Sequence, residues 1–190
     1  MSIVTKGISM FLLAVMILVL LVMIVLGFML GFGHPLPWIL IGMLIIIPLI
    51  HDKIVSKRFV KWNESYSVGI ESIDNDHKKL LGMINQLQTA SHYSTEDGMV
   101  DEILNELVEY TKYHFNREEK MLLEHNYPEF DAHKQQHEAM IAQVSKFIDE
   151  YRLHNSRTID EVIQYLKSWL VNHINGCDQE YSSYLKDKVK

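Results

Sequence analysis

Seven side chains of the types that bind metal ions fall in four separate stretches of this chain. The stretches hold one histidine, then H-x-x-x-E, then H-x-x-x-H, and finally H-x-x-x-x-D. In order, the residues are His77, His114, Glu118, His133, His137, His173 and Asp178. Five imidazoles and two carboxylates supply enough donors to hold two metal ions side by side. These residues therefore predict a site for two metal ions.

Two of the stretches have the four-residue spacing of neighbours on one helix face. His114 and Glu118 form one such pair, and His133 and His137 form the other. In a helix both members of a pair project from the same side, so the backbone orients them before any metal ion arrives.

The pair formed by His173 and Asp178 is spaced less favourably. Residues five apart lie about 140° apart around an ideal helix. These two side chains converge only if Asp178 reaches back or if the helix loosens locally, and Gly176 lies between them.

The donor types narrow the choice of metal. Mixtures of imidazole and carboxylate suit iron, zinc, manganese or copper, whereas calcium and magnesium prefer oxygen ligands. Ionisable groups on inward helix faces are costly unless they pair or bind metal. The other histidines have no partner at ligand spacing and are interpreted as turn, junction and surface residues: His34, His51, His92, His125 and His154.

Four helical stretches must position these side chains. Apolar residues recur at helical spacing over residues 75–93, 99–125, 129–153 and 158–187, with short connections between them. No segment has the two-residue period of a strand. This pattern predicts an all-α domain, an antiparallel up-down-up-down four-helix bundle covering residues 62–187.

The N-terminal part of the chain is apolar. Every residue from Met10 to Met29 is apolar or glycine, a run of about 20 residues, which is enough to span a bilayer. A second run, Leu36–Ile50, is shorter and contains Pro37 and Pro48. We therefore expect a transmembrane helical hairpin, with one or two spans in residues 1–51 and a junction over residues 52–61. A cleaved signal peptide is disfavoured, because its apolar region would be shorter.

The distribution of charge suggests an orientation and excludes one class of partner. Lys6 is the only Lys or Arg before the second run ends, and Lys53, Lys57, Arg58 and Lys61 follow it. Basic residues on both flanks predict that both ends of the hairpin face the cytoplasm. The chain has a formal net charge of −6, which disfavours nucleic-acid binding. Its single cysteine, Cys177, cannot form an intrachain disulfide.

Four motifs resemble those of the bacterial hemerythrins. They are W-N-E-S-Y-S-V-G-I-E-S-I-D-N-D-H-K-K-L at residues 62–80, H-F-N-R-E-E at 114–119, H-K-Q-Q-H at 133–137 and W-L-V-N-H-I-N-G-C-D at 169–178. The resemblance covers about residues 60–187 and does not include the apolar N-terminal part. Asp76, directly before His77, stands where relatives often have Gln or Glu, which could change the orientation of a ligand.

The resemblance implies two non-haem iron ions, joined by an oxo or hydroxo bridge, that bind O2 reversibly. One iron would be held by three histidines and the other by two, with both carboxylates bridging and a vacant position for O2 on the second iron. The implied ligands are His133, His137 and His173 for the first iron, His77 and His114 for the second, and Glu118 and Asp178 for the bridges. Trp169 and Leu170 resemble the apolar lining of the O2 pocket.

Three functions remain open from the sequence. The leading one is an O2-binding protein, not an enzyme, at the bacterial inner membrane, with its di-iron domain facing the cytoplasm. It would store O2 or deliver it to a membrane oxidase or oxygenase. The alternatives are a sensor of O2 or redox state that acts on a membrane partner, and a di-iron enzyme that reduces NO or peroxide.

Overall fold

The computed structural model describes residues 3–56, 59–93, 98–154, 157–186 and 188, with side chains omitted for residues 3–10, 13, 51–56, 154, 157 and 158. Its elements are α1 (Ile3–Met29), α2 (Pro35–Ser56), the short 3-10 helix η1 (Glu64–Tyr66), α3 (Glu71–Tyr93), α4 (Met99–Glu124), α5 (Phe130–His154), α6 (Arg157–His173), the π-helical segment η2 (Ile174–Asp178) and α7 (Gln179–Leu185). Within these ranges there is no strand. The prediction of an all-helical protein is therefore confirmed.

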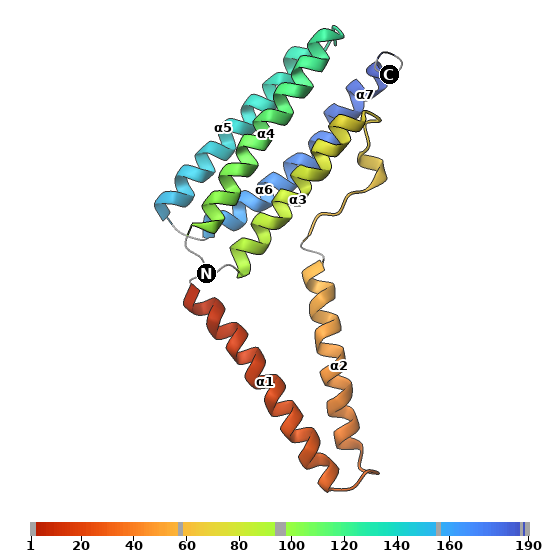
Figure 1. Ribbon diagram of the computed structural model, residues 1–190, viewed down its shortest axis with the longest axis vertical. Coiled ribbons are helices and arrows are strands. Elements are labelled where there is room, and N and C mark those ends of the chain that lie inside the picture. Colours follow the sequence, from red (N-terminus) through yellow and green to blue (C-terminus); the bar gives the residue numbers. More distant parts are fainter. Residues whose placement is uncertain (1–2, 57–58, 94–97, 155–156, 187, 189–190) are drawn as a thin grey trace. The chain divides into compact units, whose positions relative to one another are not determined.

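The chain divides into two compact units, residues 1–59 and 60–190. In the second unit α3 packs against α4 and α6, and α5 packs against the same two helices, which closes a four-helix bundle (Figure 1). Because each helix is linked to the next by a short connection, neighbours run in opposite directions. The bundle thus brings four stretches that are distant in sequence to a common core.

Several helix ends differ from the predicted ranges by one residue, and two differences are larger. The first bundle helix begins at Glu71 rather than near residue 75, because the Ile70 carbonyl accepts hydrogen bonds from the amides of Ile73 and Asp74. The last stretch is not one continuous helix, because η2 separates α6 from α7. Residue 187, where the last helix was predicted to end, lies outside the described residues.

The bundle has two apolar clusters. The larger one fills the space between α3, α4, α5 and α6 and includes Leu80, Ile84, Leu104, Leu107, Val144, Val162, Leu166 and Leu170. The smaller one, near α7, consists of Leu122, Tyr127, Tyr181 and Leu185. The residues of the predicted metal site lie along the helices between these clusters, so apolar side chains border the site in both directions.

The segment before α3 is tied to the bundle by hydrogen bonds. The side chain of Asn85 binds both the amide and the carbonyl of Val60. Asp74 accepts from the Val68 amide at 2.8 Å and from the Ser67 hydroxyl at 2.6 Å. Because Val68 is also buried, this segment covers the end of α3 from which His77 projects.

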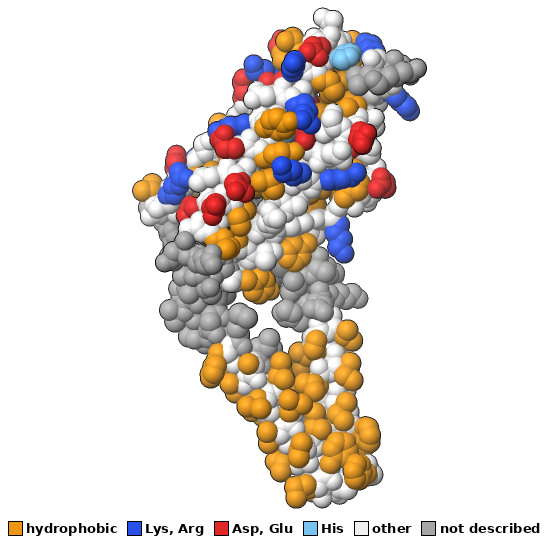
Figure 2. Space-filling model, in the orientation of Figure 1, with side chains coloured by type: hydrophobic (Ala, Val, Ile, Leu, Met, Phe, Trp, Pro, Cys, Tyr) orange, Lys and Arg blue, Asp and Glu red, His pale blue; other side chains and the backbone are white. Residues whose placement is uncertain are grey.

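The first unit is a pair of helices. Gly27 of α1 faces α2, where an added Cβ would lie 3.1 Å from Cγ of Pro37, and Gly31 adopts the left-handed conformation in the turn (φ 111°). Many apolar side chains are exposed on both helices, and they dominate the face seen in Figure 2. By length and hydropathy, no helix in the described ranges qualifies as a membrane span. The structure thus contains the predicted hairpin but does not support its assignment as transmembrane.

The core of the bundle gives a first prediction about stability. Leu107 of α4 is 1% exposed, whereas Leu123 of the same helix is 62% exposed. Leu107→Ala should lower the free energy of unfolding by about 2–5 kcal/mol, because it leaves a cavity in the core. Leu123→Ala should change it by no more than about 0.5 kcal/mol. Urea unfolding of both variants checks this, and equal losses would show that the core is packed differently.

Candidate metal centre

All seven predicted ligands are buried, each no more than 4% exposed, and they meet in the core of the bundle. The first comes from α3, two each come from α4 and α5, one comes from α6, and Asp178 ends η2. The donor atoms form two groups that share Glu118. One group is Glu118, His133, His137 and His173, and the other is His77, His114 and Glu118, each with donor atoms within 4.8 Å of one another.

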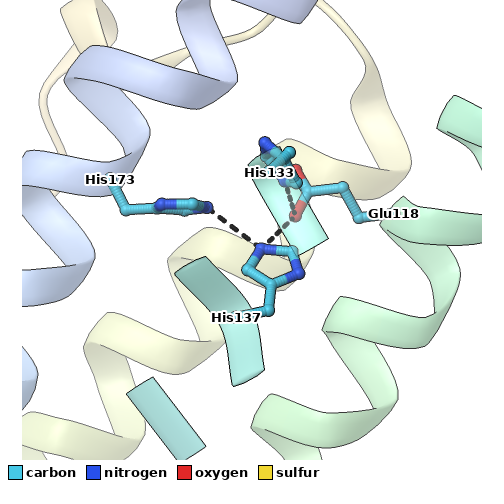
Figure 3. Close-up of side chains that lie close together, drawn as sticks. All are labelled: Glu118, His133, His137 and His173. Atoms are coloured by element: carbon cyan, nitrogen blue, oxygen red, sulfur yellow. Dashed lines mark hydrogen bonds and ion pairs between the residues drawn. The ribbon is translucent and has the colours of Figure 1, made fainter. Parts of the chain in front are cut away.

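The larger group has the spacing that a single metal ion requires. In octahedral coordination at about 2.1 Å, adjacent donors lie about 3.0 Å apart and opposite donors about 4.2 Å apart. Nε2 of His137 lies 3.0 Å from Nε2 of His173 and 3.4 Å from Oε2 of Glu118. Nε2 of His133 lies 3.6 Å from the same carboxylate oxygen. Figure 3 shows these side chains converging from α4, α5 and α6.

Asp178 lies between the two groups. Its Oδ1 is 3.2 Å from Nε2 of His173 and 3.9 Å from Nε2 of His133. Its Oδ2 is 3.3 Å from Nε2 of His77, which belongs to the other group. The two oxygens of one carboxylate thus face different groups, which is the arrangement of a ligand that bridges two ions.

Glu118 is placed differently from Asp178. Its Oε2 faces His133 and His137 and also lies 3.6 Å from Nε2 of His114. Its Oε1 instead accepts a short hydrogen bond from the hydroxyl of Tyr181. One oxygen of Glu118 therefore faces both groups, while the other is held by a phenol.

The π-helical segment explains how His173 and Asp178 converge. In a π-helix the backbone bonds join residues five apart, so these residues come to the same side. The helix loosens between the two ligands, and Asp178 does not reach back along a regular α-helix. A side chain at Gly176 would meet open space, so the segment does not depend on this position lacking a Cβ.

The pKa values of His77, His173 and Glu118 favour cation binding, whereas that of Asp178 opposes it. Burial lowers the pKa of His77, and burial together with the neighbouring His137 lowers the pKa of His173 to about 2. Both rings are therefore neutral and keep a free electron pair. Burial opposes ionisation of Glu118, yet His114, His133 and His137 hold its pKa well below the usual value. Burial and the charge of Glu118 raise the pKa of Asp178 well above its usual value.

Many of the donor atoms have no hydrogen-bond partner. Among the described residues these include both ring nitrogens of His77 and of His133, Oε2 of Glu118, and both oxygens of Asp178. Buried polar atoms without partners are costly, because their hydration is lost and nothing replaces it. A pair of cations at the two donor groups would supply the missing interactions, so the residues present fit two metal ions.

Several side chains around the donors are not evident from ligand spacing. Phe115 stacks on His137 with ring centroids 3.7 Å apart, and Trp169 stacks on His173 at 4.3 Å. Glu119 lies 3.0 Å from Nδ1 of His137. The available sequence signals are weak: Phe115 and Glu119 directly follow a ligand, and Tyr181 lies one helical turn beyond Asp178.

The predicted pocket residues Trp169 and Leu170 line a small apolar cavity in the bundle core. The other lining residues are Leu80, Ile84, Leu107, Thr111, Phe115, Met140 and Leu166. Several lie one helical turn from a ligand, such as Leu80 after His77 and Met140 after His137. The cavity therefore lies beside the donor groups, on the side of the larger apolar cluster.

The histidines not assigned to the site have other surroundings. Nδ1 of His34 accepts from the Leu36 amide in the turn after α1, and Nδ1 of His125 lies 2.8 Å from the Met121 carbonyl at the end of α4. His92 lies in the last turn of α3. The side chains of His51 and His154 lie outside the described part of the chain.

The raised pKa of Asp178 leads to a prediction for the metal-free protein. A carboxyl group whose folded pKa is raised costs stability as pH rises above its unfolded value of about 3.9. Asp178→Asn removes this cost, so its stability relative to wild type should grow between about pH 5 and 7.5. The same change should reduce metal content, because an amide cannot bridge two cations. Urea unfolding and metal analysis test both effects, and a stability difference independent of pH would contradict the first.

The comparisons with known proteins agree with this site. The family model described as "Hemerythrin HHE cation binding domain" matches residues 68–185. The chain is 38% identical over 128 residues to a bacteriohemerythrin of Stenotrophomonas maltophilia, covering 66% of this chain and 80% of that protein. It is 32% identical over 124 residues to a hemerythrin-like protein of Naegleria gruberi, covering 65% and 92%. A crystal structure of wild-type hemerythrin aligns with a TM-score of 0.57 at 25% identity, covering 65% and 95%. The chain belongs to the hemerythrin family.

Proposed function

We propose that this protein binds O2 reversibly at a pair of non-haem iron ions. The observation that carries the proposal is the pair of donor groups joined by shared carboxylates, one with three imidazoles and the other with two. An ion in the group with fewer protein donors would have room for an external ligand. Two iron ions held there would supply the electrons by which O2 binds and is released.

The residues that hold the ions divide their roles. His133, His137 and His173 would hold one iron, and His77 and His114 the other. Asp178 would bridge the two irons, because its two oxygens face different donor groups. Glu118 would also contact both ions, with Oε2 facing both groups. The hydroxyl of Tyr181 orients this carboxylate by donating to its other oxygen.

The apolar cavity supports binding of a small neutral molecule. Trp169 and Phe115, which stack on two of the ligands, also line the cavity. The hydroxyl of Thr111, another lining residue, donates to the Leu107 carbonyl at 2.8 Å and is therefore engaged. An apolar lining with few free polar groups favours O2 over water. The residues that line the cavity also include no free proton donor. Reduction of NO or peroxide needs protons, so this lining favours an O2-binding protein over an enzyme.

We also propose that the α1–α2 hairpin keeps this domain at the bacterial inner membrane, on its cytoplasmic side. The proposal is supported by the apolar side chains exposed on both helices, including Leu18, Val25, Trp38 and Ile45. Apolar surface of this extent marks a contact with lipid or protein. At that location bound O2 would be available to a membrane oxidase or oxygenase.

Optical spectroscopy of the iron-loaded protein tests O2 binding. Visible absorption bands should appear when O2 is added to the reduced protein and should disappear when O2 is removed, over repeated cycles. His114→Ala should lower the iron content toward one ion per chain and abolish the reversible bands, because the second group loses one of its two imidazoles. Irreversible oxidation of wild type in the first cycle, or steady consumption of NO or peroxide, would refute the O2-carrier function.

Fractionation tests the proposed location. The full chain, expressed in a bacterium, should sediment with membranes and resist extraction by high salt, because the hairpin contacts are apolar. A chain lacking residues 1–59 should remain in the supernatant and still bind iron. Recovery of the full chain in the supernatant would refute membrane attachment, and protease cleavage of the bundle from the outer side would refute the cytoplasmic orientation.

A further inference from the structure

A buried carboxylate outside the seven donors faces the group that has fewer histidines. Asp76, directly before His77, is only 4% exposed. Its Oδ2 lies 3.6 Å from Nδ1 of His114, whose other ring nitrogen faces Glu118 at 3.6 Å. The two nitrogens of His114 thus face opposite ways, one toward the metal site and one toward Asp76.

This arrangement has a chemical consequence for a metal-bound imidazole. When one ring nitrogen binds a cation, the other carries the proton and needs an acceptor. Nδ1 of His114 is buried and has no partner within hydrogen-bond distance. Asp76 is close enough to accept its proton after a small movement of either side chain. A carboxylate in this position fixes the ring and increases its donation of electrons to the metal.

Asp76 is itself held by groups that reach the protein surface. Its Oδ1 accepts from the hydroxyl of Tyr110 at 2.6 Å, and its Oδ2 accepts from Nη1 of Arg117 at 3.0 Å. The Arg117 guanidinium also lies over the ring of Tyr113, and its Nη2 donates a short hydrogen bond to the Tyr113 hydroxyl. The Arg117 side chain is 37% exposed. A cation and a phenol therefore share the negative charge that faces His114.

The other donor group has an outer carboxylate with different surroundings. Glu119 lies 3.0 Å from Nδ1 of His137, and its side chain is 18% exposed. It lines a surface groove together with Lys112 and Lys134. The ion pairs found for these lysines are with Glu109 and Glu138. The carboxylate beside His137 is thus closer to solvent, while the one beside His114 is buried and bound by Arg117.

We propose that Asp76 is a positioning residue for His114 and that Arg117 limits how strongly Asp76 increases electron donation by that ring. The proposal rests on the proposed binding of two irons, and it deepens that function by assigning a control of the redox preference of the site. Asp76 favours the oxidised, more positive state of the metal pair. Arg117 opposes this by neutralising part of the carboxylate charge.

The two residues should therefore shift the midpoint potential of the iron pair in opposite directions. Asp76→Asn removes the negative charge and should raise the potential. It should also weaken binding of the iron at His77 and His114 by roughly 10-fold. Arg117→Met leaves the carboxylate uncompensated and should lower the potential. Asp76→Glu should restore much of the wild-type behaviour, because it keeps the carboxylate.

Lys120→Met is the matched control for Arg117→Met. It removes one positive charge from the same helix, and Lys120 is exposed and paired only loosely with Glu124, at 3.8 Å. The potentials are measured on the full chain by titration with redox mediators under nitrogen, and iron content is measured separately. Neither measurement needs O2, so irreversible oxidation in air would refute the carrier function without affecting this test.

Opposite shifts in Asp76→Asn and Arg117→Met, both larger than in Lys120→Met, would support the proposal. A purely structural role predicts that both variants lose metal or shift in the same direction, and either result would overturn it. Potentials and iron contents equal to those of Lys120→Met would also overturn it. A wild-type chain that held no iron would refute this proposal and the proposed function together.

Discussion

The core of the bundle encloses two carboxylates, Glu118 and Asp178, and the rest of the fold has to accommodate them. Both carboxylates are completely inaccessible to solvent, and the charge of Glu118 contributes to the raised pKa of Asp178. Two like charges in a low-dielectric interior repel strongly, and each has also lost its hydration. The surrounding imidazoles have several nitrogen atoms without a hydrogen-bond partner. Cations between these groups would relieve the repulsion and replace the lost hydration, so metal binding should contribute to the stability of the folded chain.

The rest of the bundle encloses the metal site. The larger apolar cluster lies on one side and the cluster around Tyr181 lies on the other. The segment before α3 covers a further edge, where Gln179 and Ser182 donate to its carbonyls. Enclosure excludes water from the donors, which strengthens every electrostatic interaction among them. The same enclosure produces the apolar surroundings that suit a small neutral ligand.

The side chains next to the donors give the two halves of the site different characters. Tyr181 holds one oxygen of Glu118, while Asp76 and Glu119 face the outer nitrogens of His114 and His137. In the described part of the chain, Asp76 forms an ion pair with an arginine, Arg117, and no such pair is found for Glu119. Donor groups that are similar in composition can therefore differ in how readily the metal is oxidised. The asymmetry in the number of histidines is accompanied by an asymmetry in the surrounding charge.

The predicted donor set and the helices that carry it can be read from the sequence. Residue type and four-residue spacing are local properties, so His114 with Glu118, and His133 with His137, could be paired before any tertiary structure was known. The helical period likewise predicted the bundle. The apolar N-terminal runs predicted a hairpin, which is present, but their membrane-spanning character is not supported. Hydropathy shows that a segment is removed from water, but it does not show whether lipid or protein covers it.

Packing between the helices determines which donors share a group, how Asp178 turns inward, and which residues contact the outer nitrogens of the ligands. These features depend on the register of helices that are far apart in sequence. Arg117 and Tyr110 of α4 reach Asp76 of α3, and Tyr181 of α7 reaches Glu118 of α4. The π-helical segment depends on backbone bonding within the folded bundle, and a side chain at Gly176 would have room. Local patterns fix which side chains one helix offers, whereas packing between helices fixes the atoms that those side chains meet.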